Sequence, residues 1–296
     1  MKKIFFTFIF LLIATFPAFA EVNIITSYPY IKDITEKIGK DKVKVMALAN
    51  GNWDPHFIIP RPSMIAKSRK ANLLIINGAQ LEIGWLPQII KQANNPEIQI
   101  GTKGLLDLSS YIKLIEVPSG ISRAQGDVHP QGNPHFLLDP YNIPLISKAI
   151  SDKLSQLDSE NSAFYKANYT NFTSQWALKL KEWDNKLKAL KGVKVVEYHR
   201  LFDYFIGRFH LQFVIALEPL PGIPPTPRHL MEVIKTVKTE NVKFIFQDVY
   251  HPDEAAKFVS QKTGVKVIIV PQDIGAIREV TDIFSLFDYI VNELTK

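Results

Sequence analysis

The stretch from Asp158 to Leu190 contains neither proline nor glycine, and it constrains the fold of this chain more than any other feature. Large apolar side chains recur along it mostly three or four residues apart, at Phe164, Tyr165, Tyr169, Phe172, Trp176, Leu178, Leu180, Trp183 and Leu187. This spacing predicts one helix of about thirty residues, about 45 Å long. Such a helix can join two domains as a stiff spine, unlike a Gly/Ser linker, so we expect only modest domain motion when a ligand binds.

Short β-branched runs alternate with amphipathic stretches on both sides of this spine helix. Before it, strands are expected at 22–27, 42–48, 72–78 and 98–102, and helices near 30–39, 62–71 and 81–93. After it, strands are expected at 193–199, 212–218, 243–249 and 265–270, and helices near 201–209, 227–240, 252–263 and 282–294. This alternation is typical of parallel sheets covered on both faces. The prediction is an α/β chain with domains at 21–157 and 192–296, each on a four-stranded parallel sheet, joined by the spine helix at 158–191.

The first twenty residues have the layout of a secretory signal peptide. Two lysines precede an apolar run from Ile4 to about Phe16, and a small-x-small end follows at Ala20. The run is shorter than the roughly 20 residues of a membrane-spanning helix, so we expect cleavage of residues 1–20. The chain has no cysteine, which excludes disulfides, thiolate metal sites and a lipid-modified anchor cysteine. We therefore expect an unanchored periplasmic protein.

The charge of the chain gives no reason to expect nucleic acid as a partner. The formal net charge is +6, and two of the positive charges belong to the predicted signal peptide. No basic cluster follows in the remainder of the sequence, as a nucleic-acid-binding surface would require.

Two similar stretches, WDPHFIIP at 53–60 and GNPHFLLDP at 132–140, each place a histidine between a proline and a phenylalanine. His56 follows the second predicted strand, His135 follows a loop rich in glycine and proline, and His199 closes the first strand of the second half. Ligand sites in open α/β sheets lie at the carboxyl ends of strands. Together with Asp273, which follows the last strand, these residues offer three nitrogens and one oxygen, a set that suits four-coordinate zinc. From spacing alone, ordinary loop histidines remain the alternative.

The other histidines are weaker candidates. We expect His210, His229 and His251 to be surface residues, because they fall near predicted helix ends. His129 shares a loop with His135, and whether it takes part in metal capture stays open.

Several further residues have expected roles near the strand ends. Glu197 and Glu218 could each orient an imidazole, and nothing in the sequence chooses between them. Asp139 and Pro140 are predicted to be the N-cap and first residue of a helix. No nucleophile elbow, phosphate-binding glycine loop or H-E-x-x-H motif occurs, so we do not expect an enzyme.

The order of these motifs resembles the cluster A-I solute-binding proteins, the zinc- and manganese-binding components of ABC importers. The matching stretches cover nearly the whole mature chain, at 54–90, 132–172, 196–213, 224–252 and 264–273. The resemblance implies two α/β domains held by a long helix, with one metal ion buried between them. It places ligands at His56 and His135 in one domain and at His199 and Asp273 in the other.

Zinc is the expected cargo. The segment GDVHPQGNPHF is similar to the zinc-binding subgroup, and His199 gives a third nitrogen where manganese-type members have a carboxylate. Many zinc members carry a long histidine-rich loop near this place, whereas this chain has only His129 there. We expect a monomeric periplasmic carrier that delivers Zn²⁺ to the permease of an inner-membrane ABC transporter, with weaker zinc affinity below about pH 6. The alternatives are manganese or iron as cargo, or an exported zinc hydrolase with Asp273 as general base.

Overall fold

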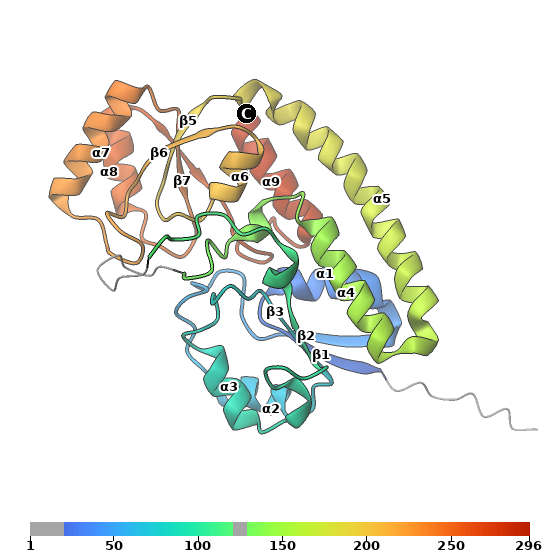
Figure 1. Ribbon diagram of the computed structural model, residues 1–296. Coiled ribbons are helices and arrows are strands. Elements are labelled where there is room, and N and C mark those ends of the chain that lie inside the picture. Colours follow the sequence, from blue (N-terminus) through green and yellow to red (C-terminus); the bar gives the residue numbers. More distant parts are fainter. Residues whose placement is uncertain (1–20, 121–128) are drawn as a thin grey trace, which may run out of the picture.

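The molecule contains two β-sheets, each built of parallel strands, and both lie on the same side of one long helix (Figure 1). The computed structural model describes residues 21–120 and 129–296, so the predicted signal peptide at 1–20 lies outside the described residues. Each sheet has four strands, and every pair of neighbouring strands is parallel. The predicted α/β fold with two sheets and a linking helix is confirmed. The domain boundaries at 21–157 and 192–296 stay a prediction.

The first sheet has the strand order β2-β1-β3-β4. Its strands are β1 (Val22–Thr26), β2 (Val43–Ala47), β3 (Leu73–Ile76) and β4 (Leu105–Asp107), accompanied by α1 (Pro29–Gly39), α2 (Pro62–Ser68), α3 (Leu86–Ala93) and α4 (Ile143–Leu157). Successive side chains of a strand point to opposite faces, and Ile24 and Ile25 on β1 are both fully buried. Both faces of this sheet are therefore covered, as parallel sheets require.

The predicted strand at 98–102 is wrong. Residues Pro96–Ile98 form a short 3-10 helix, and the chain then turns through Gly101, whose φ of 84° is left-handed. Ile100 is 87% exposed, so its apolar side chain contributes nothing to the core. The fourth strand of the sheet is β4, a few residues later, because proline and glycine interrupt the extended conformation that the apolar pattern suggests.

The second sheet has the strand order β6-β5-β7-β8. Its strands are β5 (Lys194–Glu197), β6 (Gln212–Ala216), β7 (Phe244–Gln247) and β8 (Lys266–Ile269), and its helices are α6 (Asp203–Arg208), α7 (Pro227–Glu240), α8 (Glu254–Thr263) and α9 (Ile283–Thr295). All four strands and all four helices predicted for this half are present. In both sheets the chain reverses its strand order beside the first strand, which opens a crevice at the carboxyl ends of the strands.

The spine helix is α5 (Ser162–Leu187), 26 residues long, with a short 3-10 turn at each end. Trp176 and Trp183 are both fully buried on its inner face, with ring centroids 5.0 Å apart. Their rings also contact Phe287 of α9, at 5.6 Å and 5.3 Å. The helix therefore packs against an element of the second half as well as against α1 and α4 of the first (Figure 1).

The start of α4 differs from the prediction. The helix begins at Ile143 with Asn142 as its N-cap, and not at Asp139 and Pro140. The Asp139 carboxylate instead accepts a hydrogen bond from the Tyr141 amide (2.9 Å) and pairs with Arg208 (2.7 Å). The aspartate therefore shapes a turn before the helix, a use that competes with helix capping for this residue type.

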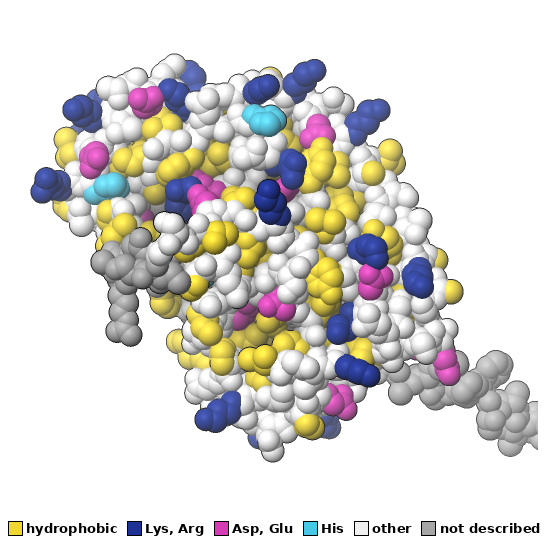
Figure 2. Space-filling model, in the orientation of Figure 1, with side chains coloured by type: hydrophobic (Ala, Val, Ile, Leu, Met, Phe, Trp, Pro, Cys, Tyr) yellow, Lys and Arg dark blue, Asp and Glu magenta, His cyan; other side chains and the backbone are white. Residues whose placement is uncertain are grey.

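Charged side chains are scattered over the face drawn in Figure 2, where Lys and Arg lie among Asp and Glu and form no single basic patch. Within residues 21–120 and 129–296, no helix combines the length and apolar character needed to cross a bilayer.

We predict that Trp176→Ala lowers the free energy of unfolding by about 3–5 kcal/mol, because it removes a fully buried indole at the junction of α5 and α9. Denaturant titration followed by circular dichroism measures this. Leu178→Ala on the same helix is the control, because Leu178 is 74% exposed and its loss is expected to change stability by no more than about 0.5 kcal/mol. Equal effects of the two substitutions would contradict the packing role of Trp176.

Candidate metal centre

His56 lies in the loop that follows β2, and its local turn is set by the residues just before it. The Asp54 carboxylate accepts hydrogen bonds from the His56 amide (2.9 Å) and from His56 Nδ1 (3.0 Å). The Pro55 carbonyl accepts from the Tyr28 hydroxyl (3.1 Å) and from Trp85 Nε1 (3.2 Å). Because Nδ1 of His56 donates its N–H to Asp54, the lone pair of Nε2 is available to accept a hydrogen bond or to bind a metal ion.

His135 is held by the same kind of turn. Its amide donates to Asn133 Oδ1 (2.9 Å), and the Pro134 carbonyl accepts from Asn77 Nδ2 (3.0 Å). An Asx side chain therefore fixes the histidine in both WDPHFIIP and GNPHFLLDP, while a buried donor fixes the proline carbonyl. The side chain of His135 is 7% exposed, and its Nε2 has no hydrogen-bond partner among the residues that the structure describes. A buried nitrogen of this kind is satisfied by a bound cation.

His199 follows β5, and Glu218 orients it. The distance from His199 Nδ1 to Glu218 Oε2 is 2.7 Å, and both side chains are buried. Glu197, the other predicted partner, instead accepts a hydrogen bond from the Phe202 amide (2.7 Å). The carboxylate of Glu218 thus leaves Nε2 of His199 as the free nitrogen, an arrangement common for metal-bound imidazoles.

His251 is not the surface residue that the sequence predicts. It is half-buried, stacks on Tyr198 with ring centroids 4.4 Å apart, and its Nδ1 lies 2.9 Å from Asp248 Oδ2. Its Nε2 lies 3.5 Å from the second oxygen of Glu218. His229 is also half-buried, with Nε2 on the Ala216 carbonyl (2.9 Å). Only His210 of the three is exposed, as predicted.

The structure brings the three predicted histidines together. The ring centroid of His56 lies 5.2 Å from that of His135 and 5.4 Å from that of His199, and the last two are 5.6 Å apart. The loops after β2 and β5 and the loop before α4 therefore meet at one place, between the two sheets.

His129 joins this group, which sequence reasoning left open. Its Nε2 lies 3.2 Å from Nε2 of His56. Among the residues that the structure describes, His56, His129 and His135 form the one group whose possible ligand atoms all lie within 4.8 Å of one another. Burial, together with charge repulsion from His56 and His199, lowers the pKa of His129 to about 3.

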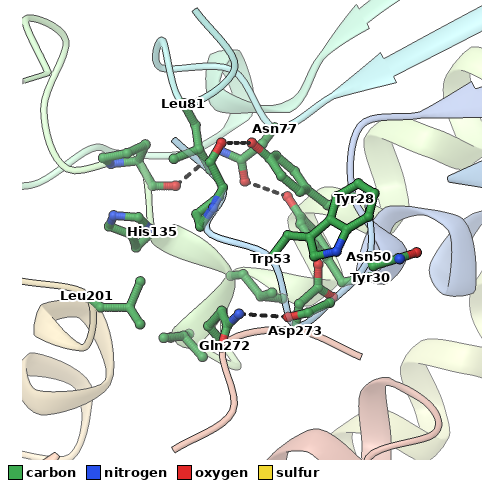
Figure 3. A pocket seen from close by; sticks show the side chains of 15 residues that line it. Tyr28, Tyr30, Asn50, Trp53, Asn77, Leu81, His135, Leu201, Gln272 and Asp273 are labelled. Carbon is green, nitrogen blue, oxygen red and sulfur yellow. Dashed lines mark hydrogen bonds between the residues drawn. The ribbon is translucent and has the colours of Figure 1, made fainter. Parts of the chain in front are cut away.

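Asp273 lies behind His135 and outside that group. Figure 3 shows it beside Gln272 and near Tyr30, on the wall of a cavity of about 40 Å³ that His135 also lines. Its Oδ1 accepts a hydrogen bond from the Ile274 amide (2.6 Å). Burial raises the pKa of the Asp273 carboxyl well above its usual range, against hydrogen bonds from the amides of Ile274 and Tyr30.

A second cavity, of about 260 Å³, opens on the other side of the histidines. His129, His135 and His199 line it together with Glu116 and Arg200. Arg200 forms ion pairs with Glu116 from the first half of the chain and with Asp203 from its own half. Of the three histidines that line it, His129 is half-buried, whereas His135 and His199 are buried.

A family model and several curated relatives match this chain. A family model described as "Zinc-uptake complex component A periplasmic" matches residues 24–296. Among curated relatives, the "Metal ABC transporter substrate-binding lipoprotein SloC" of Streptococcus mutans is 23% identical, over 83% of this chain and 79% of its own. The "Manganese ABC transporter substrate-binding lipoprotein PsaA" of Streptococcus pneumoniae is 24% identical, over 83% of this chain and 78% of its own.

Solved structures share the fold. The crystal structure of ZnuA superimposes with a TM-score of 0.79 at 24% identity, over 93% of this chain and 98% of its own. The Cd-bound periplasmic metal binding protein of Candidatus Liberibacter asiaticus gives a TM-score of 0.76 at 21% identity, with the same coverage. On the match over residues 24–296, the chain belongs to the zinc-uptake complex component A family.

Proposed function

We propose that this protein is the substrate-binding component of a metal ABC importer, and that it carries Zn²⁺ through the periplasm to its permease. The observation that carries the proposal is the convergence of His56, His135 and His199 from two α/β units. Within residues 21–120 and 129–296, the buried Nε2 of His135 has no hydrogen-bond partner. The fourth position has two candidates: Asp273, which the sequence predicts, and His129, which lies against His56.

The donor set supports zinc over manganese. Imidazole nitrogens suit zinc, whereas manganese sites in proteins favour carboxylate and carbonyl oxygens. Manganese stays the alternative cargo, because relatives of this chain are named as manganese proteins. Iron is the other alternative.

A carrier also fits better than a hydrolase. A catalytic zinc needs an open coordination position for water, beside a general base. The proposed general base, Asp273, is turned to the amide of Ile274 and shares a cavity of only about 40 Å³ with His135. These contacts support a carrier whose metal ion is surrounded by protein ligands, rather than an enzyme whose metal ion keeps a position for water.

Release into the periplasm without a lipid anchor is also part of the proposal. The curated relatives are named lipoproteins, and their anchors require a cysteine that this sequence does not contain. The resemblance supports a cognate permease as the partner of a monomeric carrier.

Two of the imidazoles in the site are kept neutral, which favours metal binding. Burial, with repulsion from His56, His199 and His129, lowers the pKa of His135 well below its usual range. The pKa of His129 is lowered to about 3 in the same way. Both rings therefore keep a free lone pair at pH values where an isolated histidine is protonated.

We predict that His199→Ala weakens zinc binding by at least about 100-fold, because it removes an imidazole ligand that the second domain contributes. Elemental analysis of protein purified from its native periplasm should then show one zinc per wild-type chain and none in the variant. His210→Asn is the control: His210 is exposed, and asparagine tolerates its φ of 57°. A variant that keeps full stoichiometry and affinity would contradict the site.

We further predict that the zinc affinity decreases as the pH drops below 6. The decrease should be less steep than for a site of four histidines that all have the usual pKa. A ring of pKa 6.5 is about 3% neutral at pH 5, which costs about 30-fold in affinity, so four such rings would cost about 10⁶-fold. Because the pKa of His129 is lowered to about 3 and the pKa of His135 is lowered well below its usual range, we expect a smaller loss than this. Chelator competition at pH 7.5 and pH 5 measures it. Equal affinities at the two pH values, or a loss near 10⁶-fold, would contradict this prediction.

A further inference from the structure

We propose that His129 is itself a ligand of the transported ion, which is then held by four imidazoles: His56, His129 and His135 from the first domain and His199 from the second. This inference rests on the proposed function and assigns one further residue to the same site. It also narrows the cargo to metals that accept four nitrogen donors.

The spacing between His129 and His56 is that of two ligands of one ion. Zn–N bonds of about 2.0–2.1 Å in a tetrahedron separate the ligand atoms by about 3.3–3.4 Å. The observed distance between the two Nε2 atoms is 3.2 Å. Because the proton of the His56 ring lies on Nδ1 beside Asp54, its Nε2 accepts a hydrogen bond from Nε2–H of His129 in the metal-free protein. When zinc binds, it would take the place of this hydrogen bond. The single proton of the neutral His129 ring would then lie on Nδ1, so that Nε2 can bind the ion.

The position of His129 in the fold supports the same role. His129 lines the cavity of about 260 Å³ that His135 and His199 also line, and it is half-buried whereas those two are buried. An ion that arrives through this cavity meets His129 before it reaches the buried Nε2 of His135. With ligand atoms of His56, His129 and His135 all within 4.8 Å of one another, the first domain alone offers three nitrogens to the ion. His199 then completes the shell from the second domain.

In this arrangement Asp273 does not bind the ion, and its partners are backbone amides. Its carboxylate accepts a hydrogen bond from the amide of Ile274 (2.6 Å), and an amide at the start of α1 also stabilises its charged form. It lines the cavity of about 40 Å³, to which His135 contributes but His56, His129 and His199 do not. A shell that contains His129 in its place has four neutral nitrogens and no carboxylate, which selects zinc-like ions over manganese.

Zinc K-edge absorption spectroscopy counts the imidazoles bound to the metal and tests this inference directly. We expect four imidazoles in the wild type and in Asp273→Asn, and three in His129→Ala. At saturating zinc, His199→Ala should also show three. In chelator competition, His129→Ala should bind zinc at least about 10-fold more weakly than wild type, with a smaller change for Mn²⁺. His210→Asn is the matched histidine control and should behave as the wild type.

Three imidazoles and one oxygen in the wild type, unchanged in His129→Ala and lost in Asp273→Asn, would overturn the inference and leave the proposed function intact. A wild-type protein that binds no stoichiometric metal would overturn the proposed function itself. Circular dichroism of each variant shows that it is folded, so that lost binding reports on the site.

Discussion

The fixed spacing of the two domains is the constraint on which the metal centre depends, because His56 and His135 belong to one domain and His199 to the other. Packing of Trp176 and Trp183 against α9 sets this spacing on one side of the molecule. Asp33 of α1 reinforces it, since its carboxylate accepts a hydrogen bond from the Ile283 amide at the start of α9 (3.1 Å).

A second contact fixes the domains close to the histidines. The side chain of Gln272 donates to the Gly51 carbonyl (2.6 Å), and a Cβ on Gly51 would lie 1.9 Å from the carbonyl oxygen of Ile274. Only glycine fits this approach. The loop that carries His56 and the loop that carries Asp273 are thus in direct contact, which leaves little freedom for large domain motion.

Much of this architecture could be predicted from local sequence patterns, because those patterns reflect burial. The spacing of aromatic residues along α5 and the β-branched runs of the second sheet lead to the observed elements. Two predictions failed for identifiable reasons. Pro96 and Gly101 displace the fourth strand, and Asp139 forms a turn and pairs with Arg208 where a helix start was expected. Such competing uses of a turn residue are decided by tertiary contacts.

Site residues that directly follow a strand could be placed from the sequence. Contacts between two loops could not. His56 and His199 follow strands, and their convergence follows from the topology. The contact between His129 and His56 joins two loops. The choice of Glu218 over Glu197 depends on where each carboxylate points, because Glu197 ends β5 and accepts from the Phe202 amide, whereas Glu218 follows β6 and reaches His199. One signal was visible in the sequence: the shared Asx-Pro-His order, which fixes both histidines through the same turn.

The central claim is that one metal ion binds between the two domains, at the free nitrogens of these histidines. Anomalous diffraction from a zinc-soaked crystal, with data above and below the zinc absorption edge, locates the ion directly. We predict a single strong anomalous peak among the Nε2 atoms of His56, His135 and His199. A crystal whose anomalous peaks lie only elsewhere on the protein, or that shows none, would contradict the account.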